Sequence, residues 1–171
     1  LAFNDERGLI HVLEHLGFAY RQQAMYDQAI ETIQLHCHLA ETIQDTYRVC
    51  TALRNLGNVY FEQGNNEQAF VSLINALAIA QEYSYLRENI DVLNDLAGVL
   101  WSQSNKNQAF QYLQQALEMA IDIGYQQMIG YLIGNIGVLY DTNGDYDAAL
   151  SCYLHDLRLN IALGSLTLLT R

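Results

Sequence analysis

The chain has 171 residues, a formal net charge of -11 and a hydrophobic fraction of 51%. Its eight lysines and arginines are scattered, which argues against nucleic-acid binding, because phosphates require clustered positive side chains. No apolar run reaches the roughly 18 residues of a membrane span, and three cysteines without paired spacing favour a reducing, cytoplasmic compartment over a disulfide framework.

One repeated unit organises the chain. Forms of the stretch from Asn55 to Phe70 recur with a period of 40 residues, anchored by the pairs Leu16-Gly17, Leu56-Gly57, Leu96-Ala97 and Ile136-Gly137. Counted from Glu6, four units of equal length cover residues 6–45, 46–85, 86–125 and 126–165. Such a period is typical of a stacked-repeat protein, in which each unit buries its apolar face on its neighbours.

Each unit is predicted to contain two helices. Apolar residues three and four positions apart place the first helices near 7–23, 46–63, 86–103 and 126–143. The second helices are expected near 26–43, 66–83, 106–123 and 146–163. No strand is expected.

The turn inside each unit combines a C-terminal glycine with a polar cap. Gly64 and Gly144 fit the glycine position, and the predicted caps are Asn65, Asn105 and Asp145. The first and third units carry Ala24 and Ser104 instead of glycine. We expect these two turns to deviate locally, because left-handed backbone is costly for other residues.

The same spacing predicts the buried columns. On the first helices they are Leu9/Val49/Asn89/Ile129, Val12/Ala52/Val92/Leu132, Leu13/Leu53/Leu93/Ile133, Leu16/Leu56/Leu96/Ile136, Ala19/Val59/Val99/Leu139 and Tyr20/Tyr60/Leu100/Tyr140. On the second helices they are Ala29/Ala69/Ala109/Ala149, Ile30/Phe70/Phe110/Leu150, Ile33/Leu73/Leu113/Tyr153 and Cys37/Leu77/Leu117/Leu157. Where two units have alanine, the first has His36 and the fourth has Asp156. Both need polar partners if they are buried, and Asp156 is expected to face a following unit.

The run Leu53-x-x-Leu56-Gly57-x-x-Tyr60, followed by Ala69-x-x-x-Leu73 and Ala76, resembles the signature of the tetratricopeptide repeat family. The period of 40 is similar to the variant found in kinesin light chains and bacterial signalling proteins. The resemblance implies an all-α, right-handed superhelical solenoid of helix-turn-helix repeats, forming one array over residues 1–171. Residues 1–5 and 166–171 are then expected to be parts of flanking repeats or a cap, in a fragment of a longer protein.

Two histidine-rich motifs invite a catalytic or metal-binding interpretation. The stretch from His11 to His15 spells H-x-x-E-H, a zinc-peptidase motif, but its members occupy ordinary polar columns of the repeat. In His36-Cys37-His38, neighbouring side chains on a helix point about 100° apart and do not close one metal site unaided. We expect no enzyme activity, no catalytic residues, no cofactor and no bound metal.

Polar and aromatic residues follow one stripe of the first helices, where the resemblance implies a concave, peptide-binding groove. The resemblance further implies that inner asparagines hold a peptide backbone and that basic neighbours grip acidic or amide groups. The candidate groove residues are Arg54, Asn55, Asn58, Phe61, Arg87, Asn94, Trp101, Tyr131 and Asn135.

Two functions follow from this pattern. The first is a non-enzymatic interaction module that binds a peptide segment or partner domain, with no nucleic acid and no membrane. The alternative is a sensing domain that binds a ligand or peptide and controls an attached kinase, nucleotide cyclase or transcription factor. The chain is also expected to self-associate through its end repeats, where Leu157, Ile161 and Leu168 would be exposed.

Overall fold

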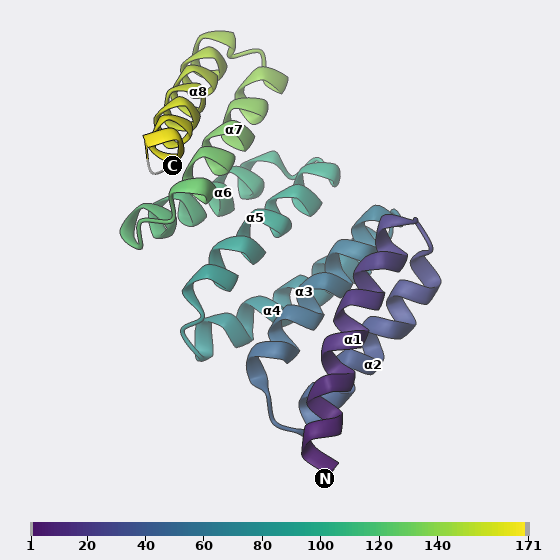
Figure 1. The fold of residues 1–171 in the computed structure, drawn as a ribbon. Helices are drawn as coiled ribbons and strands as arrows, with labels where there is room; N and C mark the ends of the chain where they lie inside the picture. Colours follow the sequence, from purple (N-terminus) through teal and green to yellow (C-terminus); the bar gives the residue numbers. More distant parts are fainter. Residues whose placement is uncertain (1, 170–171) are drawn as a thin grey trace.

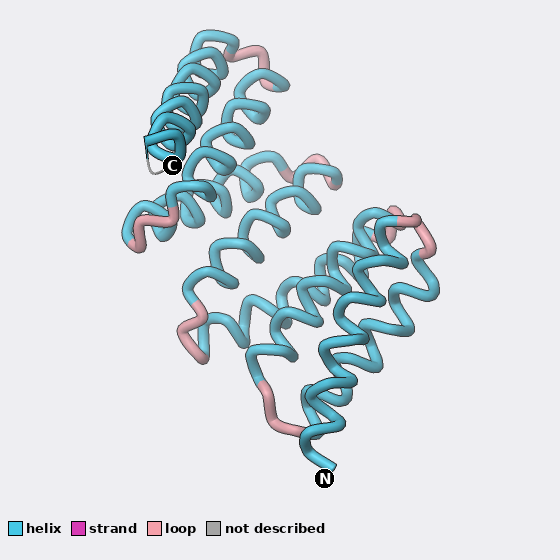
Figure 2. The backbone as a smooth tube through the Cα atoms, viewed as in Figure 1, coloured by secondary structure: helices cyan, strands magenta, loops and turns pink. Residues whose placement is uncertain are grey.

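The computed structural model describes residues 2–169, with side chains described for residues 6–162. The fold is all-α, as predicted: eight antiparallel helices follow one another along the chain (Figure 1), and no strand occurs within the described range (Figure 2). The helices are α1 (Ala2–Gln22), α2 (Tyr26–Thr42), α3 (Thr46–Glu62), α4 (Asn66–Glu82), α5 (Leu86–Ser102), α6 (Lys106–Asp122), α7 (Gln126–Thr142) and α8 (Tyr146–Leu169). None of these helices, as far as they are described, combines the length and apolar character that a membrane crossing needs.

The six inner helices match the predicted boundaries to within one residue. At the two ends the helices are longer than expected, because α1 begins at Ala2 and α8 continues to Leu169. Residues 2–5 and 166–169 therefore prolong these helices, and no turn separates them from the repeats.

The helices pack in sequence, each against the next, and α3 also contacts α5 directly. In a curved stack, elements on the inner side lie closer together than those on the outer side. The contact between α3 and α5 therefore places the first helices of the repeats on the concave side.

All seven turns use a residue in the left-handed region. The φ values are 55° for Ala24, 57° for Gln44, 87° for Gly64, 56° for Ser84, 64° for Ser104, 67° for Gly124 and 82° for Gly144. After Ala24 and Ser104, the next backbone N–H donates to the carbonyl five residues earlier at 2.9 Å, as it does after the glycines at 2.8–3.0 Å. The expectation that these two turns deviate is wrong, because the hydrogen bonds impose one geometry on alanine and serine at a cost of about 1 kcal/mol.

The predicted caps are only partly confirmed. Asn65 and Asp145 each accept a hydrogen bond of 3.2 Å from a backbone N–H in the first turn of the helix that follows. Asn105 makes no such bond, and its amide Nδ2 donates to Gln108 Oε1 at 2.8 Å instead. The side chain of Gln108 thus replaces the backbone as the partner of this cap residue.

The inner repeats bury most of the predicted columns and half-bury Val49, Leu53, Tyr60, Phe70, Phe110 and Leu117. Leu56, Leu96 and Ile136 are at most 9% exposed, and the alanines at positions 29, 69, 109 and 149 are buried. The glycine after Leu56 is required by packing, since a Cβ on Gly57 would lie 2.6 Å from Leu73 Cγ. Helices of one repeat thus approach too closely for any side chain there.

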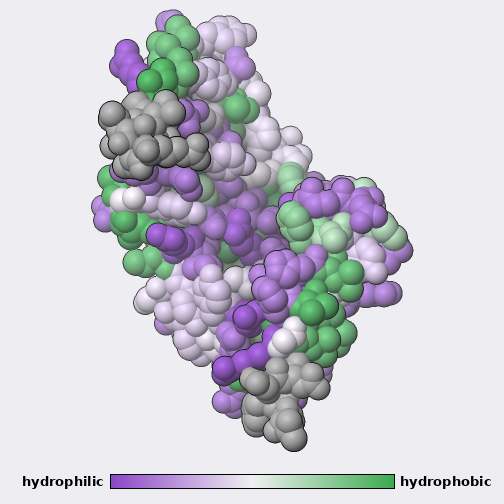
Figure 3. Space-filling model, viewed as in Figure 1, coloured by the Kyte–Doolittle hydropathy of each residue, from purple (hydrophilic) through white to green (hydrophobic). Residues whose placement is uncertain are grey.

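Apolar side chains are exposed on α1, contrary to the prediction. Leu9, Val12 and Leu16 are 46%, 59% and 38% exposed. In the later repeats the equivalent positions face the second helix of the preceding repeat, and no described helix precedes α1. Figure 3 shows this hydrophobic patch in green over α1 and a second green patch over α8.

The patch on α8 includes two residues predicted to be exposed at the end of the stack. Leu157 and Ile161 are 54% and 62% exposed, as expected for the end of the stack. The third residue of that prediction, Leu168, lies outside the described side chains. The prediction that Leu150, Tyr153 and Leu157 belong to buried columns is wrong on α8, because no described helix covers this face. Self-association through this surface stays a prediction.

One buried column escaped the sequence analysis: Ile10, Cys50, Ile90 and Gly130. It faces the column of His36 and Asp156 within the same repeat, because a Cβ on Gly130 would lie 2.8 Å from Asp156 Oδ1. The expectation that Asp156 faces a following unit is therefore wrong. The missing side chain of Gly130 makes room for the carboxylate, which also accepts a 2.8 Å hydrogen bond from Asn160 Nδ2.

Candidate functional site

A groove crosses α3, α5 and α7 on the concave side. It contains a hollow of about 380 Å³ whose walls carry the exposed rings of Phe61 and Tyr131. Gly98 forms part of its floor, where an added Cβ would meet nothing within 4 Å. Six of the nine predicted groove residues line this hollow: Asn58, Phe61, Asn94, Trp101, Tyr131 and Asn135.

An ion-pair network joins α3 to α5 beside the hollow. Arg54 Nε donates to Asp95 Oδ2 at 2.7 Å, and Arg54 Nη1 donates to Asp91 Oδ2 at 2.8 Å. Asn58 Nδ2 donates to the same oxygen of Asp95 at 3.0 Å. One guanidinium is thus shared between two carboxylates of the protein itself, through Nε and Nη1.

Burial and pairing act in opposite directions on these charged groups. Burial lowers the pKa of Arg54, but the carboxylates of Asp95 and Asp91 outweigh burial, so the net shift of this pKa is upward. Burial raises the pKa of Asp91, although the guanidinium of Arg54 opposes that shift. The network carries two negative charges against one positive charge at neutral pH, so this part of the groove does not attract an acidic ligand.

A second contact, between amides, joins α5 to α7. Asn135 Nδ2 donates to Asn94 Oδ1 at 2.8 Å. No described residue donates to Oδ1 of Asn135 or to Oδ1 of Asn58. These two half-buried oxygens remain available as acceptors inside the groove.

Arg87 and Asn55 lie away from this hollow, and Trp101 within it already contacts a cation. Arg87 covers the ring of Tyr125, with 5.1 Å from its Cζ atom to the ring centroid, and does not line the hollow. Asn55 lines a separate hollow nearer the N-terminus. Trp101 lines the groove, and Lys106 Nζ stands 4.9 Å from its ring centroid.

The sequence contains a signal for the contacts between repeats that the sequence analysis missed. Most of the paired side chains in neighbouring first helices are separated by 41 or 37 residues, one period plus one or minus three, and the pair Glu14–Arg48 is separated by 34. Arg54 pairs in this way with Asp95 and Asp91, and Arg21 pairs with Glu62 at 2.7 Å. Opposite charges at these two separations therefore indicate pairing across the concave surface.

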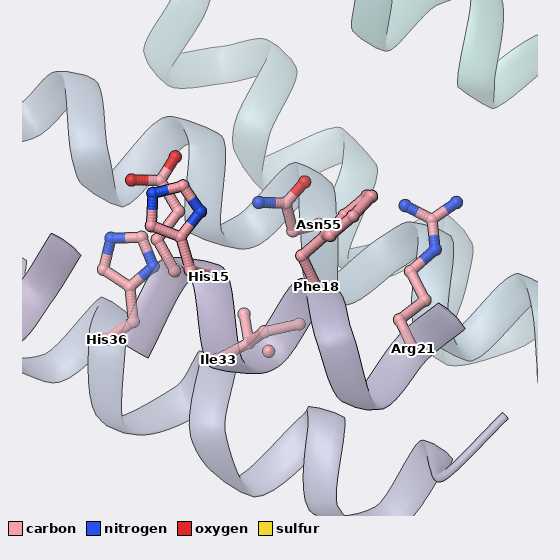
Figure 4. Close-up of a pocket in the computed structure, with 8 residues that line it drawn as sticks. His15, Phe18, Arg21, Ile33, His36 and Asn55 are labelled. Carbon is pink, nitrogen blue, oxygen red and sulfur yellow. The ribbon is translucent and has the colours of Figure 1, made fainter. Parts of the chain in front are cut away.

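The separate hollow, of about 370 Å³, lies between α1, α2 and α3. Figure 4 shows His36 and His15 at one end of it and Arg21 at the other, with Ile33, Phe18 and Asn55 between them. His36 is 1% exposed, and neither of its ring nitrogens has a hydrogen-bond partner in the described structure. Burial lowers the pKa of His36, which favours the neutral imidazole.

The two histidine motifs have structural surroundings that differ from a metal centre. His11 and His15 are exposed, with 3.1 Å between their Nε2 atoms. In the second motif His36 is buried and His38 is exposed, while burial raises the pKa of the Cys37 thiol to about 11. Within the described side chains, no group of three His, Cys, Asp or Glu is arranged to hold a metal ion.

Comparisons with known proteins address the family and the fold. Sequence models of the tetratricopeptide repeat match residues 48–122 and residues 132–167. No curated protein sequence matches the chain.

Several solved structures share the fold. BtubC (BKLC) from P. vanneervenii superposes with a TM-score of 0.79 at 19% identity, over 91% of this chain and 64% of that protein. The Rap conjugation gene regulator of plasmid pLS20, solved in complex with the Phr* peptide, gives 0.73 at 19% identity, over 83% of this chain and 40% of the regulator. A putative kinesin light chain repeat protein from Podospora anserina superposes with a TM-score of 0.74 at 14% identity, over 90% of this chain and 75% of that protein. The chain thus spans less than two thirds of the first two structures.

Proposed function

The chain belongs to the tetratricopeptide repeat family, and from this premise we propose that it is a non-enzymatic interaction module that binds a peptide segment of a partner protein. Domains of this family generally bind proteins or peptides, and the concave face of a solenoid offers the extended surface that such binding needs. The observation that carries the proposal is the hollow over α3, α5 and α7, where exposed aromatic rings stand beside amide oxygens that lack donors.

The geometry favours a peptide over a small polar solute. An extended peptide presents backbone N–H groups, which match the free acceptors on Asn58 and Asn135. An apolar side chain of the peptide fits over Gly98, between the rings of Phe61 and Tyr131. The Rap regulator, which shares this fold, was solved with a peptide bound, in keeping with the proposal.

The charges revise one expectation about the partner. Arg54 was expected to grip acidic groups, but its guanidinium is held by Asp91 and Asp95. Arg21, which also lines the hollow, is held by Glu62. We therefore propose apolar and amide recognition, with a weak dependence of affinity on salt concentration.

The substitution Tyr131→Ala tests the proposal, with Tyr146→Ala as its matched control. Both tyrosines are exposed, at 58% and 69%, but only Tyr131 lines the hollow. Each variant would be used to recover partners from an extract of the source cells, and the recovered segment would then be titrated against both. We expect Tyr131→Ala to weaken binding at least tenfold, about 1.4 kcal/mol, with an unchanged melting temperature. Equal affinity of the two variants would exclude the groove as the site.

The sensing role stays a second candidate, because a relative in fold is described as a gene regulator bound to a peptide. A sensor must bind its ligand differently in two conformations, and a stacked array changes its curvature through small shifts at each repeat. Small-angle scattering distinguishes the two roles. A change in the radius of gyration on adding the recovered peptide favours a sensor, and an unchanged radius favours simple docking.

A further inference from the structure

The hollow between α1, α2 and α3 presents a buried imidazole that nothing in the described structure satisfies. Both ring nitrogens of His36 lack a partner, although the residue is 1% exposed and lines the hollow. Buried polar groups nearly always have a hydrogen-bond partner from the protein, from water or from a ligand. An orphaned imidazole at the wall of an open hollow therefore points to a molecule that enters it.

Comparison with the next repeat shows how unusual the arrangement is. Asp95, one period after Asn55, accepts hydrogen bonds from Arg54 and Asn58. By contrast, no hydrogen bond joins the amide of Asn55 to any described residue, and this half-buried side chain lines the same hollow as His36. The hollow between α1, α2 and α3 thus leaves two neutral polar side chains unpaired, whereas the equivalent carboxylate one period later is paired.

The charged residues around the hollow are already paired. Arg48 Nη1 lies 3.4 Å from Glu14 Oε2, and Arg21 Nη2 lies 2.7 Å from Glu62 Oε1. A charged ligand would have to compete with these ion pairs. A neutral ligand needs only the imidazole and the amide.

Size and lining narrow the ligand further. The hollow measures about 370 Å³, more than twice the ~150 Å³ cavity that admits one benzene molecule. Phe18, Ile33 and Gly17 supply apolar lining. The space suits a short aliphatic chain that ends in a neutral polar group.

We propose that this hollow binds a primary carboxamide, from a glutamine or asparagine side chain of a peptide or from free glutamine. The NH₂ group of the carboxamide donates to the unprotonated ring nitrogen of His36, and its oxygen accepts from Asn55 Nδ2. The aliphatic stem packs against Phe18 and Ile33. A carboxylate of the same shape can accept from the N–H of the ring but has no proton to donate, so it leaves the unprotonated nitrogen of His36 without a donor.

This site shares only Arg21 with the hollow over α3, α5 and α7, and its test uses a single amide that does not require the groove. The probe is N-acetylglutamine N-methylamide, titrated into the whole chain with ¹⁵N-labelled histidine and followed by NMR. We expect a saturable shift of the His36 ring nitrogens. The corresponding glutamate derivative should bind at least tenfold more weakly. Free glutamine, titrated in parallel, separates the two sources: tighter binding of the capped probe assigns a peptide side chain, and tighter binding of the free amino acid assigns the metabolite.

His36→Ala is the main variant, because alanine occupies the equivalent positions 76 and 116 and the helix pair is therefore expected to fold. Because this variant lacks the reporter imidazole, its binding of the probe is measured by saturation-transfer NMR, and the signal should disappear. Asn55→Ala should weaken binding of the probe at least fivefold, and it remains informative if His36→Ala does not fold. Gln34→Ala, exposed on the same helix as His36, is the matched control and should bind like the unaltered chain. The absence of saturable binding at tens of millimolar probe would overturn the proposal and assign the hollow to water. Equal binding of the glutamate probe, or unchanged binding in the folded variants, would overturn it as well.

Discussion

Replacing Gly98 with leucine is expected to stabilise the chain and to block the groove at the same time. Glycine inside a helix costs about 1 kcal/mol relative to a good helix former, and at Gly98 an added Cβ meets no atom within 4 Å. The free energy of unfolding should therefore rise by about 1 kcal/mol. For a chain of this length that raises the melting temperature by roughly 2–4 °C.

The effect on binding follows from volume. A leucine side chain at Gly98 would occupy part of the hollow of about 380 Å³ that Gly98 lines. Phe18 and Val138 occupy the equivalent positions in other repeats, so the fold accepts large groups there. We expect the affinity for the bound peptide to fall at least tenfold, about 1.4 kcal/mol.

The chain contains its own reporter for this experiment. Trp101 is its single tryptophan and lines the hollow, so its fluorescence follows titration of the recovered peptide, while circular dichroism follows thermal unfolding. Gly8→Leu is the matched control, because Gly8 also lies in a helix with no atom within 4 Å of an added Cβ. It should raise stability without affecting binding. A lower melting temperature for Gly98→Leu, or an unchanged affinity, would refute the reasoning.

Three further predictions concern stability. Asn89 is 7% exposed and its Oδ1 has no partner in the described structure. Asn89→Val, which copies Val49, should therefore raise the free energy of unfolding by about 1 kcal/mol, as measured by urea titration. A decrease would show that the amide is satisfied. Ala24→Gly should raise the free energy of unfolding by about 1 kcal/mol, because φ is 55° at this turn. Gly64→Ala should lower it by a similar amount. Melting temperatures equal to that of the unaltered chain would contradict both. Burial lowers the pKa of His36 below 6.5, so the folded chain takes up this proton less readily than the unfolded chain, and stability should fall as the pH drops below about 6.5. His36→Ala should remove that fall between pH 7.5 and 5.5, and identical pH profiles would contradict the assignment.

Local patterns were enough to predict the helices and most of the core. Leu56, Leu96 and Ile136 recur at one period and lie on one helical face, so their burial follows from spacing alone. The close approach at Gly57 was equally predictable, because a small residue recurs at that position. The geometry of the turns was less predictable. Ala24 adopts a left-handed backbone conformation because backbone hydrogen bonds across the turn outweigh its intrinsic preference.

The candidate site was also predictable only in part. Six groove residues lie on the concave stripe, and the repeat period was enough to place them there. The period shows which positions are equivalent, but the crossing of neighbouring helices decides which of them touch. Only that crossing brings Arg54 within 2.8 Å of Asp91 and Asp95 and leaves it neutralised.

By itself, then, the sequence determined the family, the eight helices and the columns that face inward, because these depend on residue type and spacing along one chain. The tertiary structure alone decided that Leu9 and Val12 stand exposed, that Asp156 turns toward Gly130, and that His36 is buried without a partner. The last two depend on what the neighbouring helix presents at the point of contact, and the first on the lack of a described helix against that face of α1. Burial and hydrogen bonding depend on two surfaces in contact, and the repeat period of the sequence does not specify which surfaces meet.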